Sequence, residues 1–174
     1  MRPIIIGVCG SYSGVGKTFI ASYLLKNLQG WGAIKYTKTN LYSTIIDDEN
    51  VLLEEGKDTR RLYDAGAKKV IWVRSPFEEL SESLDIAIGS LRDLEGIVIE
   101  GNSAVSVAKP DIVIFVFGSD KSKAKDNIEA LLKSADIIVY DDEIPINISE
   151  RVYLFRKGEL EGLMNAIRRI INRL

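Results

Sequence analysis

The sequence contains no histidine and only one cysteine among its 174 residues. Histidine is the commonest general base and metal ligand of proteins, so any catalysis must rely on carboxylates, lysine, threonine or the metal ion of a bound ligand. A single cysteine excludes a disulfide within the chain and is typical of a reducing compartment. We therefore expect a cytoplasmic protein, in which Cys9 is a small buried packing residue rather than a nucleophile.

Long apolar runs and an excess of charge of one sign are also lacking. No hydrophobic stretch of the sequence approaches the length that spans a membrane, and residues 1–3 lead into an apolar strand rather than a signal peptide. The formal net charge is −2, and the lysine-rich run at 121–125 does not extend into a basic patch. We therefore expect neither nucleic acid nor a membrane as a partner.

Strand-like and helix-like segments alternate along the chain, which is 46% hydrophobic and long enough to bury a core. No repeat, low-complexity tract or linker interrupts them, so we predict a single domain, residues 1–174, with a doubly wound, mostly parallel α/β sheet and helices on both faces. A polar loop is expected at 39–50. The predicted strands are 3–9, 33–38, 69–74, 96–99, 111–118, 136–140 and 152–155. The predicted helices are 17–29, 55–67, 76–91, 121–134 and 159–174.

The most specific motif lies between residues 3 and 18. A short β-branched run is followed by a glycine-rich turn, by Lys17 and Thr18, and by apolar residues at helical spacing. This order is specific to phosphate-binding loops of the P-loop NTPase type, because backbone N–H groups converge on a polyphosphate only where side chains are small. The loop residues predicted to bind phosphate are Gly10, Ser11, Ser13, Gly14, Val15 and Gly16.

The two residues after the glycines have separate predicted roles. Lys17 would reach the β- and γ-phosphates of a nucleoside triphosphate, and the hydroxyl of Thr18 would ligate Mg²⁺. The first turn of the following helix adds unpaired N–H groups and the positive end of its dipole. The sequence therefore predicts a protein that binds GTP or ATP together with Mg²⁺.

Several carboxylates are candidates for the metal site. Glu100 directly follows a buried strand and would lie at the carboxyl edge of the sheet, where it can hold Mg²⁺ directly or through water. Asp47 is predicted to ligate the metal or to position a water near the γ-phosphate, as a catalytic residue. Asp48 and Asp58 are further candidates, although Asp58 would equally serve as a helix cap.

Two lysines occur near the end of the second predicted strand. The spacing of Lys35 and Lys38 places them on opposite faces of a regular strand, so at most one would point into the site. Lys38 is at the very end of the strand. We therefore expect Lys38, rather than Lys35, to contact phosphate or an acidic substrate group.

The glycine loop departs from the usual spacing, because Ser11 stands at the usual first glycine and Gly10 precedes it by one residue. This longer form resembles dethiobiotin synthetase and its relatives. Tyr12 occupies the place at which a group of dimeric ATPases has a second lysine, which argues against that group. An ATP-dependent ligase, in which Lys38 holds a carboxylate of a small acid, is accordingly one alternative.

The order of motifs over the first two thirds of the chain resembles the MobB family. The resemblance rests on the Gly-Lys-Thr loop, the strand ending at Lys38, Gly-Lys-Asp-Thr at 56–59 leading to Ala-Gly-Ala at 65–67, and the strand ending in Glu100 and Gly101. The chain differs from MobB in having Thr39, Asn40 and Leu41, where histidine is typical.

The MobB resemblance implies a homodimer that binds GTP and Mg²⁺, hydrolyses GTP slowly, and assists a molybdopterin nucleotidyltransferase in molybdenum cofactor (molybdopterin guanine dinucleotide) biosynthesis. No guanine-recognition signature is present in the sequence, so GTP is expected from the resemblance alone. A second alternative is a non-catalytic adaptor, in which the nucleotide sets the shape of a docking surface.

Overall fold

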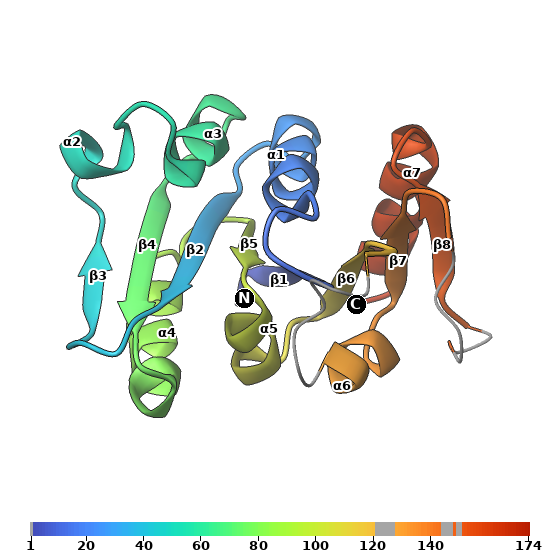
Figure 1. Cartoon of the computed structure of the whole chain (residues 1–174). Helices are drawn as coiled ribbons and strands as arrows, with labels where there is room; N and C mark the ends of the chain where they lie inside the picture. The colour runs from blue at the N-terminus through green and yellow to red at the C-terminus, as the bar shows by residue number, and fades with distance from the viewer. Residues whose placement is uncertain (1, 121–127, 144–147, 149–150) are drawn as a thin grey trace.

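The computed structural model describes residues 2–120, 128–143, 148 and 151–174. Within these residues, eight strands form one sheet in the order β3-β4-β2-β5-β1-β6-β7-β8 (Figure 1). All neighbours are parallel except β3, which runs antiparallel to β4 at the sheet edge. The strands are β1 (Ile4–Gly10), β2 (Gly32–Lys38), β3 (Thr44–Ile46), β4 (Val70–Ser75), β5 (Gly96–Glu100), β6 (Ile112–Phe117), β7 (Ile137–Tyr140) and β8 (Tyr153–Arg156).

Helices cover both faces of this sheet, as predicted for a doubly wound α/β fold. Helices α1, α3 and α7 lie on one face, and α4, α5 and α6 lie on the other (Figure 1). The helical segments are α1 (Lys17–Asn27), α2 (Glu49–Leu52), α3 (Asp58–Asp64), the 3₁₀ turn η1 (Phe77–Glu79), α4 (Leu80–Gly89), α5 (Asn102–Ala108), α6 (Ile128–Lys133) and α7 (Leu160–Ile171).

The alternation of side chains along β1 shows how the sheet is buried on both faces. Ile6 and Val8 pack in the cluster that includes α1 and α7, whereas Ile5 packs with α4 and Cys9 packs with α6. None of these four side chains is more than 6% exposed. Each buried isoleucine or valine contributes about 1.5–3 kcal/mol relative to exposure, so an apolar run on both faces of β1 places this strand inside the sheet.

The strand order gives the chain a switch point beside β1. After β1 the chain builds the part of the sheet that ends at β3, returns to β5 on one side of β1, and then crosses to β6 on the other side. Ligands of open α/β sheets bind outside the carboxyl ends of the strands at such a switch point. The glycine loop follows β1 directly and therefore lies there.

Two segments differ from the sequence prediction. The region 39–50, expected to be a loop, contains β3 and the start of α2, because three residues of Thr44–Ile46 pair with β4. Helix α5 was not predicted. It is short, and its buried side chains, Ala104 and Val105, are too few to show a helical pattern in the sequence. Of the helix predicted at 121–134, the part at 121–127, with its lysine run, lies outside the described residues.

None of the helices in the described ranges is both long and apolar enough to cross a membrane.

Candidate functional site

The start of the glycine loop is fixed to its neighbours by hydrogen bonds. The side chain of Asn102 accepts from the Gly10 N–H at 3.0 Å and donates to the Gly10 carbonyl at 2.8 Å. The Ser11 N–H donates to the Val116 carbonyl at 3.0 Å, and the Ser11 hydroxyl accepts from the Gly118 N–H at 3.2 Å. These hydrogen bonds position the loop. The N–H groups of Gly10 and Ser11 are therefore already paired within the protein.

The second half of the loop has the conformation that requires glycine. Gly14 and Gly16 have φ of 84° and 107°, values that L-amino acids with a side chain rarely adopt. Gly16 is the N-cap of α1 and offers no side chain to the first helical N–H groups. Helix α1 therefore begins with N–H groups that a bound anion can satisfy.

A cleft of about 1030 Å³ opens in front of the loop. Three predicted phosphate-binding residues do not line this cleft. Gly10 and Ser11 are held by the hydrogen bonds just described, and Val15 is a core residue that is 3% exposed. The predicted loop residues that do line it are Ser13, Gly14, Gly16, Lys17 and Thr18. A polyphosphate could therefore bind to the second half of the loop, and the first half serves as its support.

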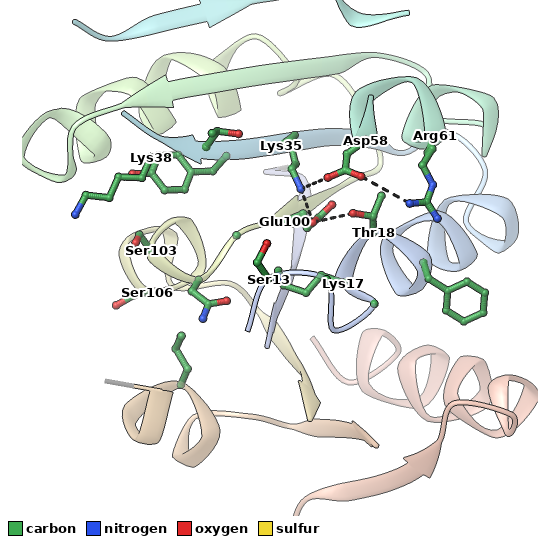
Figure 2. Close-up of a pocket in the computed structure, with 18 of the residues that line it drawn as sticks. Ser13, Lys17, Thr18, Lys35, Lys38, Asp58, Arg61, Glu100, Ser103 and Ser106 are labelled. Atoms are coloured by element: carbon green, nitrogen blue, oxygen red, sulfur yellow. Dashed lines mark hydrogen bonds and ion pairs between the residues drawn. The ribbon is translucent and has the colours of Figure 1, made fainter. Parts of the chain in front are cut away.

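Four polar groups from four different elements meet at the centre of the cleft (Figure 2). The Thr18 hydroxyl donates to Oε1 of Glu100 at 3.0 Å. The ammonium of Lys35 lies 2.6 Å from the same Oε1 and 2.7 Å from Oδ2 of Asp58. We call Thr18, Lys35, Asp58 and Glu100 the central cluster; it combines two carboxylates with one ammonium and one hydroxyl.

The electrostatics of the central cluster keep Lys35 and Asp58 charged. Burial by itself would lower the pKa of Lys35, but Glu100 and Asp58 outweigh burial and raise it above the usual 10.5. Burial by itself would raise the pKa of Asp58, but Lys35, with smaller contributions from Thr18 and Arg61, lowers it below the usual 3.8. Lys35 is therefore an ammonium and Asp58 a carboxylate over the ordinary pH range.

One carboxylate oxygen of the central cluster has no hydrogen-bond partner among the described residues. Glu100 is 1% exposed, and its Oε2 makes no hydrogen bond within the part of the chain that the structure describes. Leaving a buried acceptor unsatisfied costs about 1–3 kcal/mol, and more for a charged group. A Mg²⁺ ion fits this arrangement, because it prefers carboxylate and hydroxyl oxygens and Thr18 lies beside Glu100.

The described residues do not form a metal site of three or more histidine, cysteine or acidic side chains. A Mg²⁺ ion held by Glu100 and Thr18 would therefore take its remaining ligands from water or from the oxygens of a bound phosphate, as is usual for this ion.

The two aspartates at 47 and 48 lie elsewhere, which corrects the expectation for them. Asp47 follows β3, which runs back along β4, and it pairs with Lys69 at 3.0 Å on the surface, with 61% of its side chain exposed. Asp48 caps α2 through the Asn50 N–H at 2.9 Å. Neither residue lines the cleft, so we no longer assign Asp47 a metal-binding or catalytic role.

The lysines are arranged differently from the prediction. The ammonium of Lys17 donates to the Tyr12 carbonyl at 2.8 Å, within the loop. Lys35 and Lys38 both line the cleft, but Figure 2 shows Lys35 in the central cluster and Lys38 apart from it. Lys35 is thus the functional candidate that sequence reasoning ranked too low. Lys35 lies beside Glu100 because β2 pairs with β5. This strand order could not be predicted from the sequence.

Cys9 lies directly before the loop and is fully buried. Burial raises the pKa of its thiol to about 12. Because the thiolate is the nucleophilic form, this cysteine is inert at neutral pH and acts as a core residue.

No protein-family model and no curated protein matches the sequence. The fold is similar to that of HypB from Helicobacter pylori, solved with nickel, with a TM-score of 0.59 and 11% identity over 99% of this chain and 87% of HypB. LpxK from Aquifex aeolicus in complex with ATP gives 0.55 and 14% identity over 90% of this chain, which spans 54% of LpxK. A putative plasmid partition protein from Borrelia burgdorferi bound to AMPPNP gives 0.51 and 13% over the full length of both chains.

These similarities support the fold class, an α/β domain with a mostly parallel sheet. At such low identity they do not carry over any ligand, substrate or partner, and they do not identify the MobB family.

Proposed function

We propose that this protein binds a nucleoside triphosphate with Mg²⁺ in the cleft and hydrolyses it slowly. The observation that carries the proposal is the buried carboxylate of Glu100, which accepts from Thr18 at 3.0 Å and whose Oε2 has no hydrogen-bond partner among the residues that the structure describes. It lies beside a glycine loop whose helix begins without a side-chain cap. A phosphate chain would supply the acceptors that the helix lacks, and its metal would satisfy the Glu100 oxygen.

Each residue has a distinct role in this proposal. The N–H groups of the loop and the first turn of α1 bind the phosphates, and Lys17 neutralises the charge on their oxygens. Glu100 and Thr18 would hold Mg²⁺. When bound, this ion would stabilise the negative charge on the phosphate oxygens. Catalysis by these groups is positioning and electrostatic stabilisation.

Slow turnover follows from the state of the carboxylates. Glu100 would hold the metal, and Asp58 pairs with Arg61 at 3.7 Å as well as with Lys35, so neither carboxylate is left as a base that could orient an attacking water. We therefore expect the bound triphosphate to persist for long periods, as suits a protein controlled by its nucleotide state.

The finer assignment follows the MobB resemblance. On this basis the nucleotide is GTP, the protein is a homodimer, and it assists a nucleotidyltransferase in molybdenum cofactor biosynthesis. The solved structures of LpxK and of the partition protein contain ATP and AMPPNP, so ATP is the competing nucleotide.

Side-by-side calorimetric titrations with GTP and ATP, each with and without Mg²⁺, test the proposal. We expect micromolar or tighter binding of one nucleotide, which weakens when Mg²⁺ is removed with a chelator. Failure of both nucleotides to bind in the presence of Mg²⁺ would contradict the proposed function. Binding of ATP alone would retain the P-loop assignment and remove the support for a MobB-like role.

The ligase alternative is favoured by a separate feature of the cleft, which continues past the central cluster to Lys38, Ser103 and Ser106. These side chains offer an ammonium and two hydroxyls to a second, acidic substrate. Phosphate release that rises only when a particular small acid is added would favour the ligase over the slow NTPase. Negligible turnover together with co-purification of a nucleotidyltransferase would favour the adaptor.

A further inference from the structure

The ammonium of Lys35 occupies the position of a cation in the central cluster. It lies 2.6 Å from Oε1 of Glu100 and 2.7 Å from Oδ2 of Asp58, and its side chain is only 16% exposed. Thr18, the hydroxyl expected to ligate Mg²⁺, donates to the same Oε1 at 3.0 Å. A metal held by Thr18 and by the second oxygen of Glu100, Oε2, would therefore lie beside this ammonium and be repelled by it.

The charges around Glu100 determine which cation it would pair with in the absence of a nucleotide. Asp58 and Glu100 carry two negative charges. Lys35 pairs with both carboxylates, and Arg61 lies 3.7 Å from the other oxygen of Asp58. A divalent ion entering beside Lys35 would meet little net negative charge and a nearby ammonium, in a site where Glu100 is buried and poorly screened. Oε2 of Glu100, which has no partner among the described residues, is a single ligand and does not suffice to hold the ion.

A bound triphosphate would reverse this balance. It brings several negative charges and oxygen ligands to the loop, beside Thr18, so the metal no longer depends on the cluster alone. Lys35 lines the same cleft as Lys17 and Thr18, so its flexible side chain can leave Oε1 of Glu100 and turn to the phosphate oxygens.

We propose that Lys35 is an internal counter-ion that keeps free divalent metal out of the Thr18–Glu100 site until a triphosphate brings the metal with it. Lys35 is thus a positioning residue that makes metal binding conditional on nucleotide. The second half of this inference rests on the proposed function. The exclusion of free metal is a property of the chain alone and is measured without any nucleotide.

The test is a titration of the full-length protein with Mn²⁺ alone, in which electron paramagnetic resonance reports the free ion. We compare the wild type with Lys35→Met, Lys35→Gln and Lys35→Arg. The Met and Gln variants should bind Mn²⁺ at least about tenfold more tightly than the wild type, because the competing charge is gone. The Arg variant keeps that charge and should bind as weakly as the wild type.

A matched control comes from the surface. Lys69 pairs with Asp47 at 3.0 Å, but both side chains are well exposed, at 41% and 61%. Lys69→Met also removes a cation from a carboxylate, yet solvent screens the exposed Asp47, so Mn²⁺ affinity should not change.

Stability supplies a second readout, because removal of Lys35 leaves buried Glu100 without its counter-ion and could impair folding. The amide of Lys35→Gln still donates a hydrogen bond. Millimolar Mn²⁺ should raise the thermal midpoint of this variant clearly and that of the wild type little. A Lys35→Gln protein that binds Mn²⁺ no better than the wild type, or that Mn²⁺ fails to stabilise, overturns the proposal. Failure of the wild type to bind nucleotide with Mg²⁺ would instead refute the proposed function.

Discussion

The ammonium of Lys35 lies 2.6 Å from Oε1 of Glu100, although 65 residues separate the two in the sequence. The contact follows from the sheet, because β2 pairs with β5 in a register that places Lys35 directly beside Glu100. A shift of one residue in this register would turn one of the two side chains to the opposite face. The site therefore depends on the packing that sets the register, as well as on the glycine loop.

Replacing Lys17 tests the loop itself. Lys17→Ala should abolish detectable nucleotide binding by calorimetry, since the phosphates lose their positive side chain in the loop. The fold should survive, with an unchanged circular dichroism spectrum, because the hydrophobic core does not include this residue. Lys26→Ala, near the other end of α1, is the control and should bind as the wild type does. Unchanged affinity in Lys17→Ala would contradict the assignment of the loop.

Glu100→Gln tests the metal site with an isosteric change. We expect Mg²⁺ to improve nucleotide affinity in the wild type and to do so at least about tenfold less in the variant, because a neutral amide is a poor Mg²⁺ ligand. Calorimetry with Mg²⁺ and with a chelator measures both values. Asp47→Asn, which removes a surface ion pair, should retain the full Mg²⁺ effect. The reverse pattern would restore Asp47 as the metal ligand.

The sequence predicted the parts of this site that depend on local order. A β-branched run followed by glycines, Lys17 and Thr18 is a continuous pattern, and it identified the end of β1 and the start of α1. Glu100 was found because a carboxylate directly after a buried strand lies at the carboxyl edge of the sheet. The alternation of strands and helices was sufficient for the fold class.

The errors arose where long-range pairing decides. Lys38 lines the cleft, and its contact with phosphate or an acidic group stays a prediction. Lys35 was passed over, because only the pairing of β2 with β5 brings it to Glu100. Asp47 was placed at the site because residues 39–50 looked like a loop, whereas the three-residue strand β3, too short to show a pattern, leads it away. Asn102 was missed, since its bonds to Gly10 cross 92 residues.

Gly16→Ala should damage both stability and binding. Gly16 has a φ of 107°, and an L-residue in a left-handed conformation costs about 1–2 kcal/mol. Urea denaturation and calorimetry measure the two effects. Gly89→Ala, in open space at the end of α4, should instead stabilise the protein by up to about 0.5 kcal/mol. Equal stability of the two variants would exclude the strained conformation.

The ion pairs of the central cluster should also leave a signature in the dependence of stability on pH. Lys35 holds the pKa of Asp58 below 3.8 in the folded protein, so the free energy that Asp58 contributes is fully present above that pH. It is lost as the pH falls below 3.8 through the lowered folded-state pKa. The pKa of Lys35 is raised above 10.5, so its contribution is lost only above that value. Between about pH 5 and pH 9 both contributions should be constant.

Urea denaturation of the wild type and of Asp58→Asn at a series of pH values measures this contribution. The difference in free energy of unfolding should be constant from about pH 9 to pH 5 and should shrink below 3.8. Asp64→Asn, which removes a surface pair with Arg60 on the same helix, should show only a small difference at every pH. If the difference for Asp58→Asn persists unchanged in acid, the carboxylate of Asp58 is not held in its charged form by Lys35, and the central cluster does not act as an electrostatic unit.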